Sequence, residues 1–305
     1  MKNKWVINVL LVIIMILIVV ACIVIYICFT NDVEIIEPKT ETILFSQEDY
    51  PRIDGSTATL PLAEAFKSAF TGEDIYNIEI EHSKTHNAYV NLINKDTDLI
   101  LVTYPSKDEL QLARNSNVEL EIVPIVKEAF VFFVNKENSI DNLSLTQIQD
   151  IYSGKIKNWK DVGGIDKEII AFQRPENSGS QTGMLNLVMK DKKMMKPTTE
   201  TVSQSMADII DVISDYDNRE NAIGYSYYYY ATTMYTTEKM KLLSVNGIEP
   251  TYENIKTGLY DIQTAYYAVI RKDEPESSNT RKLLNAMISE RGQNIAKEAG
   301  YVQNY

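Results

Sequence analysis

Cysteine and histidine are almost absent from this chain. Two cysteines, Cys22 and Cys28, and two histidines, His82 and His86, occur among its 305 residues. Both cysteines lie in an N-terminal apolar run, so the rest of the chain has no thiol for a disulfide, a cysteine metal site or a cysteine nucleophile. Positive charge is also in deficit, because the formal net charge is -12. This balance argues against nucleic-acid binding and against a polybasic membrane patch.

The longest apolar run lies at the N-terminus. Residues 5–29 are apolar apart from Asn8; Lys2 and Lys4 precede them, and the first acidic residue is Asp32. Such a run can cross a bilayer of ~30 Å as a helix, and its flanking charges place the rest of the chain outside the cytoplasm. We therefore expect a transmembrane or signal-anchor helix at 1–30 and a polar linker at 31–42. The binding domain would be held at the cell membrane on its extracytoplasmic side.

Lipidation is the alternative to an uncleaved anchor. The segment Val19-Val20-Ala21-Cys22 resembles the lipobox of bacterial lipoproteins, whose cysteine is lipidated after cleavage. Residues 23–29 nevertheless stay apolar where a lipoprotein usually turns polar. An uncleaved helix and a lipid on Cys22 both remain open, and both tether the protein outside the membrane.

Short β-rich runs alternate with amphipathic stretches from about residue 50 onward, which is typical of an α/β fold. The continuous apolar run Leu99–Val102 predicts a strand buried on both faces. Further strands are expected at 78–81, 120–126, 169–172, near 242 and at 265–271, and helices at 60–70, 106–115, 145–152, from 178, at 206–214 and from 279.

Two turns combine glycine, serine and threonine between a strand and a helix, at 54–57 and at 174–182. The first N–H groups of a helix have no intrahelical acceptor and lie at its positive end, so both openings suit an anion. Gly179 permits close backbone approach, and Arg174 adds a planar, permanently charged donor. Ser56 and Ser178 can equally be plain helix caps. A Walker-type phosphate loop is missing, because no Gly-Lys-Ser/Thr closes either turn.

Both histidines lie in His82-Ser83-Lys84-Thr85-His86-Asn87. Two histidines without an acidic motif make a weak metal site, so we weigh helix capping and a ligand-contacting loop through Ser83 and Thr85 as the alternatives. A hydrolase is disfavoured because Gly-x-Ser-x-Gly is missing. We therefore predict a binding protein without catalytic residues, metal or cofactor.

The tyrosine-rich run at 225–230 suits either partner stacking or packing between two lobes, and we favour packing.

Several of these segments together resemble the phosphate-binding component of bacterial phosphate ABC transporters. The first is Asp54-Gly55-Ser56-Thr57 followed by Pro61-Leu62-Ala63. The most specific is the middle stretch, with Ile151-Tyr152-Ser153-Gly154-Lys155-Ile156, Asn158-Trp159 and Val162-Gly163-Gly164. Arg174 with Ser178-Gly179-Ser180, and Ala222-Ile223-Gly224-Tyr225, complete the similarity, which covers about residues 50–305.

This resemblance implies a type II periplasmic-binding-protein fold with two α/β lobes, the first at 43–127 and 233–305 and the second at 128–232. It implies a monomer that captures a small oxyanion, most readily phosphate, and delivers it to an ABC permease in the membrane. A membrane-anchored sensor or scaffold of the same fold is the alternative. The ligand-binding residues implied are Ser56, Thr57, Ser83, Thr103, Arg174, Ser178, Gly179, Ser180 and Gln181.

Two positions depart from the family pattern. Thr103 stands where the family has an aspartate that accepts a proton from bound phosphate. A hydroxyl can donate a hydrogen bond to phosphate and sulfate alike, so the choice between phosphate and another oxyanion stays open. Gln181 also differs from the usual family loop and could contact a larger ligand.

Overall fold

The computed structural model describes residues 14–21, 42–197, 202, 207–208, 210–211 and 220–304. The chain divides into two units, Met1–Thr42 and Ile43–Tyr305. In the first unit, residues 14–21 form a helix, while Cys22 and most of the predicted anchor and linker lie outside the described residues. No helix within the described ranges combines the length and the apolarity needed to cross a membrane.

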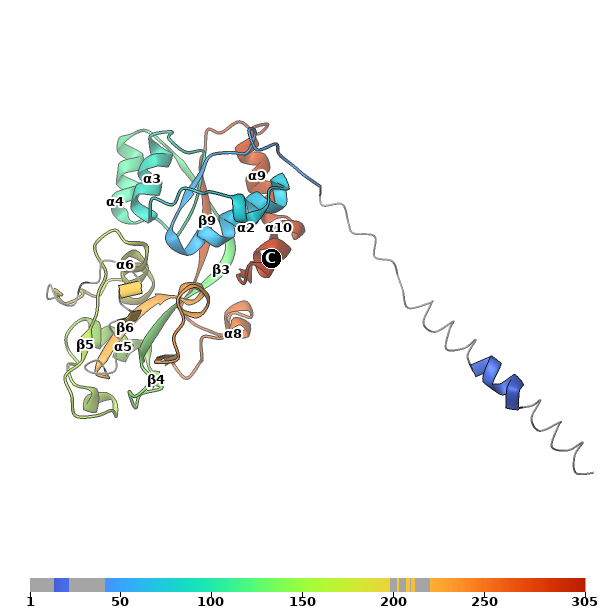
Figure 1. Ribbon diagram of the computed structural model, residues 1–305. Coiled ribbons are helices and arrows are strands. Elements are labelled where there is room, and N and C mark those ends of the chain that lie inside the picture. Colours follow the sequence, from blue (N-terminus) through green and yellow to red (C-terminus); the bar gives the residue numbers. More distant parts are fainter. Residues whose placement is uncertain are drawn as a thin grey trace, which may run out of the picture. The chain divides into compact units, whose positions relative to one another are not determined.

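One long strand organises the second unit. Strand β3 (Leu120–Asn135) pairs over its first half with β9 (Gln263–Arg271) and over its second half with β6 (Ala222–Tyr227). Its register shifts between Pro124 and Val126, where proline cannot donate to the ladder. We call the part built on the first half of β3 the first lobe, and the part built on its second half the second lobe (Figure 1).

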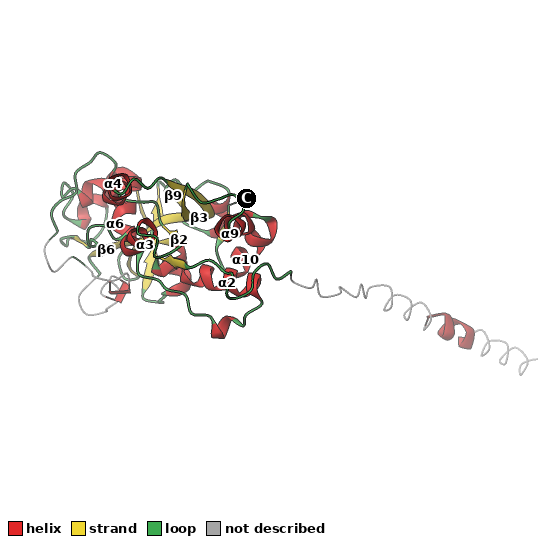
Figure 2. Cartoon of the chain, turned by 90° about the horizontal axis from the view of Figure 1, so that it is seen from above, coloured by secondary structure: helices red, strands yellow, loops and turns green. Residues whose placement is uncertain are grey.

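The first lobe is a sheet covered on both faces. Strand β2 (Leu99–Val102) pairs in parallel with β1 (Ile53–Gly55) and antiparallel with β9. Ile100 and Val102 belong to a core cluster with Tyr89, whereas Leu99 and Leu101 belong to the larger cluster with Phe66. This alternation confirms the strand predicted to be buried on both faces. The covering helices are α3 (Thr85–Ile93) and α4 (Lys107–Asn115) on one side, and α2 (Leu60–Thr71), α9 (Asn279–Ile288) and α10 (Glu290–Glu298) on the other (Figures 1 and 2).

The second lobe has an aromatic core. Phe130 and Phe132 of β3 pack against Tyr225 of β6 and Tyr152 of α5 (Leu145–Tyr152). Ser144 opens α5 with a capping box, as the predicted helix start requires. The other elements around this lobe are β4 (Asn142–Leu143), a 3-10 helix at Trp159–Val162, β5 (Ile170–Ala171), α6 (Gly179–Gly183), π-helices at Met184–Met189 and Tyr230–Met234, β7 (Met240–Leu242), β8 (Ser244–Val245) and α8 (Tyr252–Lys256).

Two short strands after residue 233 pair with strands of the second lobe. Strand β7 pairs with residues 133–135 of β3, and β8 pairs with β4. Residues 240–245 therefore lie beside second-lobe strands, although the boundary was expected at 232–233. The lobe boundaries themselves stay a prediction.

One predicted strand is wrong. Residues 78–81 form no strand and follow a short 3-10 helix at Ile75–Asn77. Ile78 is buried, but Glu79 and Glu81 are exposed. A β-rich run without a neighbouring strand to pair with stays irregular, and its apolar residues still pack. Most of the helix expected at 206–214 lies outside the described residues.

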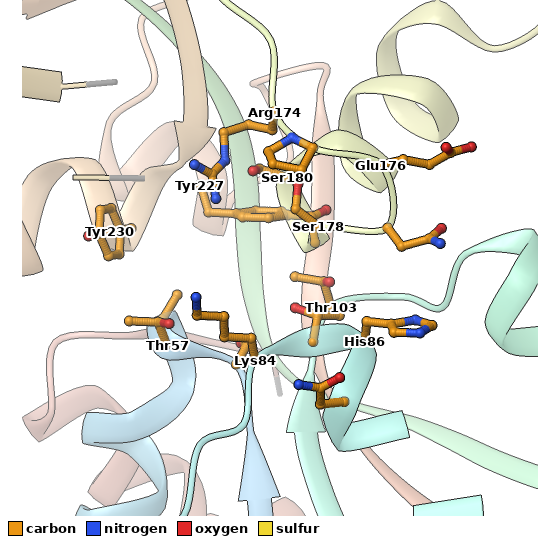
Figure 3. A pocket seen from close by; sticks show the side chains of 17 residues that line it. Thr57, Lys84, His86, Thr103, Arg174, Glu176, Ser178, Ser180, Tyr227 and Tyr230 are labelled. Atoms are coloured by element: carbon orange, nitrogen blue, oxygen red, sulfur yellow. The ribbon is translucent and has the colours of Figure 1, made fainter. Parts of the chain in front are cut away.

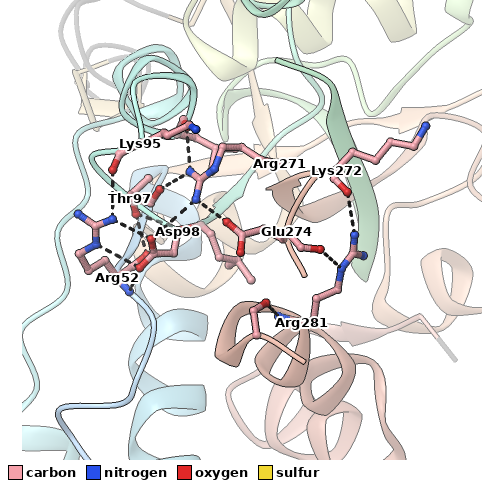
Figure 4. A network of polar contacts seen from close by, with 11 residues as sticks. Arg52, Lys95, Thr97, Asp98, Arg271, Lys272, Glu274 and Arg281 are labelled. Atoms are coloured by element: carbon pink, nitrogen blue, oxygen red, sulfur yellow. Dashed lines mark hydrogen bonds and ion pairs between the residues drawn. The ribbon is translucent and has the colours of Figure 1, made fainter. Parts of the chain in front are cut away.

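A buried arginine forms a hydrogen-bonded network at the edge of the first lobe (Figure 4). Arg271, at the end of β9, is 6 % exposed. Its Nη1 donates to the carbonyl oxygens of Leu92 (3.0 Å) and Thr97 (2.7 Å), and its Nη2 donates to Glu274 Oε1 (2.6 Å). Every charged group here therefore has a partner, as buried ions require.

Asp98 joins this network from the start of β2. Arg52 donates to both of its carboxylate oxygens, at 2.7 and 3.1 Å. Partial burial raises the pKa of Asp98, but the hydrogen bonds and charge of Arg52 outweigh that effect and hold the pKa below its usual value. The stability that this pair contributes is thus present at neutral pH and is lost as the pH falls through the lowered pKa.

We predict that Arg271→Ala lowers the free energy of unfolding by about 3 kcal/mol, because it leaves buried carbonyls and the Glu274 carboxylate without their donor. The matched control is Lys272→Ala, which removes an exposed ion pair with Glu119 and should cost less than about 1 kcal/mol. Urea unfolding of both variants measures the difference. Equal losses would show that the buried network adds nothing specific.

Glu128 lies in β3 between its two halves and is 2 % exposed. Its Oε1 accepts hydrogen bonds from the backbone N–H of Ala129 (2.8 Å) and Tyr229 (3.3 Å). Burial raises the pKa of Glu128 to about 7, although these backbone hydrogen bonds act in the opposite direction. The folded protein therefore holds this proton more tightly than the unfolded chain does.

We predict that the contribution of Glu128 to stability falls as the pH rises from about 4.5 to about 7, because ionising Glu128 costs more in the folded state. Glu128→Gln removes that cost and should raise the free energy of unfolding near pH 8 by up to about 3 kcal/mol, with little change near pH 4. Urea unfolding across this pH range tests it, with the exposed Glu137→Gln as control. Parallel curves for wild type and Glu128→Gln would refute the assignment.

Candidate functional site

The first turn opens at the end of β1. The backbone N–H of Ser56 donates to Leu101 O (3.0 Å), which holds the turn against β2. A Cβ on Gly55 would lie 2.5 Å from Leu101 O, so the close approach requires glycine. Ser56 occupies the N-cap position of a 3-10 helix at Thr57–Thr59, yet its hydroxyl makes no cap hydrogen bond. The plain capping interpretation therefore fails for Ser56.

The second turn opens α6, and here Ser178 does cap the helix. Its Oγ accepts a hydrogen bond from Gln181 N (3.2 Å). A Cβ added to Gly179 would lie 2.7 Å from the hydroxyl oxygens of both Thr85 and Thr103. The first residue of this second-lobe helix thus packs directly on two first-lobe hydroxyls. The side chain of Ser180 is buried, and its hydroxyl has no hydrogen-bond partner among the residues described.

A buried carboxylate positions the third segment. Asp54, 1 % exposed, accepts hydrogen bonds from Ser83 N (2.7 Å), Ser83 Oγ (2.6 Å) and Asn91 Nδ2 (2.8 Å). The Ser83 hydroxyl is therefore engaged in holding the start of α3 next to β1. As a consequence Thr85, two residues further on, is the residue of this segment that meets Gly179.

These three segments enclose a cavity of about 420 Å³ between the lobes (Figure 3). Seven of the nine predicted residues line it, whereas Ser83 and Gln181 do not. Their role in binding remains a prediction. The residues around the cavity are Ser56, Thr57, Ala58, Lys84, Thr85, His86, Asn87, Thr103, Arg174, Pro175, Glu176, Asn177, Ser178, Gly179, Ser180, Tyr227 and Tyr230.

Gln181 is buried behind the cavity and supports it. Its Oε1 accepts hydrogen bonds from Arg174 N (3.0 Å) and from the hydroxyl of Tyr225. This side chain therefore orients the segment that carries Arg174 and does not line the cavity. That Gln181 contacts a larger ligand stays a prediction.

Arg174 is partly buried at the second-lobe wall of the cavity. Burial lowers the pKa of its guanidinium, and the nearby Tyr225 and Asp208 act in the opposite direction. The group still stays charged, because arginine is not deprotonated in proteins. It lies in the cavity and not on the outer surface, as an anion site requires.

His86 lies at the rim with an acidic partner. Its Nδ1 is 3.2 Å from Oε1 of the fully buried Glu109, whose Oε2 accepts a hydrogen bond from Ser106 N (2.7 Å). Glu109 also belongs to the capping box of α4. His86 is thus engaged with a structural carboxylate, and no group of three metal-ligating side chains occurs in the part of the chain that the structure describes.

The tyrosine run has two roles. Tyr229 stacks on Tyr301 with ring centroids 3.6 Å apart and donates a hydrogen bond to Ala299 O (3.0 Å), which supports the packing interpretation. Tyr227 donates to Gly179 O (2.9 Å), and both Tyr227 and Tyr230 reach the cavity. The sequence missed these two positions, because a tyrosine repeat does not show which rings turn toward the gap. The sequence analysis also missed Lys84. A lysine one residue before a helix carries no sequence signal for a place in a cavity.

A family model described as a PBP superfamily domain matches residues 46–291. The chain belongs to this superfamily. The predicted resemblance is therefore confirmed, and with it a mixed α/β, two-lobed fold.

Curated relatives agree with the family match. The phosphate-binding protein PstS of Bacillus subtilis is 30% identical over 170 residues, which cover 55% of this chain and 53% of that protein. The protein of the same name from Staphylococcus aureus strain USA300 is 26% identical over 257 residues, which cover 82% of this chain and 76% of that protein. The match thus spans about half of the first relative and three quarters of the second.

A solved structure from Clostridium perfringens, described as a phosphate ABC transporter substrate-binding protein with bound phosphate, superimposes with a TM-score of 0.67. It is 26% identical, and the match covers 83% of this chain and 98% of that one. A phosphate transport receptor from Vibrio cholerae, at 20% identity and a TM-score of 0.63, shares the fold.

We predict that Asp54→Asn lowers the free energy of unfolding by about 2–4 kcal/mol. The substitution replaces one acceptor oxygen by an NH2 group, which would then face the N–H and O–H groups that donate to Asp54. Urea unfolding measures the loss, with the exposed Asp96→Asn as the control that should stay within about 0.5 kcal/mol. An unchanged Asp54→Asn variant would show that the carboxylate does not hold the third segment in place.

Proposed function

We propose that this protein is an extracytoplasmic solute-binding protein that captures a small oxyanion, with phosphate as the first candidate, for an ABC transporter. The observation that carries this proposal is the cavity in which hydroxyls of both lobes and the Arg174 guanidinium meet. An anion that leaves water needs such donors, and charge-assisted hydrogen bonds are the strongest of them. The PstS relatives, and the relative with bound phosphate, support the same assignment.

The ligand-binding residues in this proposal are Ser56, Thr57, Thr85, Thr103, Arg174, Ser178, Gly179 and Ser180. Thr85 replaces Ser83, because the Ser83 hydroxyl bonds to Asp54 while Thr85 lies at the cavity. Ser178 would contribute through the backbone that it caps. The relatives are binding proteins by name, in agreement with the prediction that this chain is not an enzyme.

Thr103 favours a second candidate function. A cavity without a carboxylate at this position cannot recognise the proton of phosphate in the way the family resemblance implies, so a sensor or scaffold module that binds another oxyanion fits as well. Calorimetry of the full chain in detergent with phosphate, sulfate, molybdate and tungstate compares the ligands. Absence of heat with all four would remove both candidates.

Tethering and lobe limits are part of the proposal. The apolar run at 5–29 would anchor the chain, either as an uncleaved helix or through a lipid on Cys22. Intact mass of the membrane-extracted protein distinguishes these, because lipidation removes the residues before Cys22 and adds acyl chains.

We propose that the protein acts as a monomer and that the second lobe extends from about 128 past Val245, as the pairing of β7 and β8 suggests.

We predict that Arg174→Ala weakens phosphate binding about 100-fold or more, because one charged partner of a desolvated anion is lost. Melting of the unliganded protein should change little. Arg114→Ala, which removes an exposed arginine of α4, should leave both properties unchanged. Strong destabilisation of unliganded Arg174→Ala, with affinity retained, would make Arg174 a structural residue and contradict the proposed site.

A further inference from the structure

Lys84 has a backbone conformation that only glycine adopts readily. Its φ is 72° and its ψ is 163°, immediately before the first residue of α3. The surroundings hold it there: Ser83 is bonded to Asp54 through both its N–H and its hydroxyl, and Ala88 N donates to Lys84 O (2.9 Å). Strain at a cavity wall, maintained by neighbours on both sides, points to a role for the side chain.

The strained backbone places the Lys84 side chain in the cavity. Figure 3 shows its ammonium on the first-lobe side and the Arg174 guanidinium on the second-lobe side, both directed into the space between the lobes. No carboxylate among the described residues lies within ion-pair distance of Lys84, unlike the paired Lys67 and Lys155. Two cations thus face one gap from opposite lobes.

The charge of the cavity wall is positive although the chain is acidic. Of the described residues that line it, Lys84 and Arg174 carry positive charge and Glu176 carries negative charge. Figure 3 shows the Glu176 carboxylate directed away from both cations. At Thr103, where a carboxylate would subtract one charge, there is a neutral hydroxyl. Asp208 lies near enough to Arg174 to act on its pKa, so the charge at this wall that no carboxylate of the described residues offsets is that of Lys84. Two cations that face one gap from opposite lobes favour a ligand with two negative charges.

We propose that Lys84 determines ligand specificity: it supplies the second positive charge and makes the cavity select a doubly charged tetrahedral oxyanion over a singly charged one. Selection then rests on total charge and not on a ligand proton, so phosphate and sulfate dianions are both accepted. This inference rests on the proposed function, because it assigns the ligand class of the same cavity.

Calorimetry of the full chain in detergent tests the inference with sulfate as the dianion and perchlorate as the monoanion of the same shape. Lys84→Gln should weaken sulfate binding about tenfold, which equals about 1.4 kcal/mol, and perchlorate binding much less. Lys84→Arg should keep most of the sulfate affinity, since it keeps the charge. The matched control Lys95→Gln removes an exposed lysine that also has a positive φ, of 70°, but lies outside the cavity.

A glycine variant separates binding from folding. Lys84→Gly should lose as much sulfate affinity as Lys84→Gln, while the melting temperature of the unliganded protein rises because glycine tolerates this backbone. A lysine needed for folding would instead lower the melting temperature. Weaker binding together with higher stability is the result expected for a residue whose strained backbone serves ligand binding and not folding.

The outcomes of these measurements separate the two proposals. If the wild-type protein binds none of phosphate, sulfate, molybdate and tungstate, the proposed function itself fails. If it binds sulfate and Lys84→Gln behaves like Lys95→Gln, the anion site stands and the role of Lys84 is overturned. Equal wild-type affinity for sulfate and perchlorate also overturns selection by charge.

Discussion

The contact between Gly179 and the hydroxyls of Thr85 and Thr103 is the constraint on which the candidate site depends. A Cβ atom at Gly179 would clash with both hydroxyl oxygens, so only glycine lets the opening of α6 approach the first lobe this closely. The approach brings a capped helix start, an arginine and the hydroxyls of Thr85 and Thr103 to one cavity. Without it the two turns would belong to separate surfaces.

Side chains behind the cavity keep its donors in place. Asp54 holds the loop before α3, and Gln181 holds the backbone of Arg174. Both are buried, and both use their acceptor oxygens on protein groups. The wall of the cavity consequently presents mainly hydroxyls and cations. In a chain with a net charge of -12, anion affinity has to come from such local arrangement and not from the overall field.

A good part of the fold could be predicted from local pattern. The apolar run at 99–102, the helices expected at 106–115 and 145–152 and the helical spacing at 60–70 all correspond to observed elements. The strand expected at 78–81 failed because pairing partners are not encoded locally. Seven of the nine predicted site residues line the cavity, but the sequence could not show that the Ser83 hydroxyl bonds to Asp54, because those two residues are far apart along the chain.

The sequence by itself determined the α/β alternation, the acidic balance, the superfamily resemblance and the two Gly/Ser/Thr turns, because these depend on residue type and on spacing over a few residues. The tertiary structure decided which side chains share the cavity, because Lys84, Thr103 and Arg174 are far apart along the chain and meet only when β3 joins the two lobes. It also decided that Gln181 faces inward and that Lys84 lies opposite Arg174, since hydrogen bonds and backbone torsions set side-chain direction.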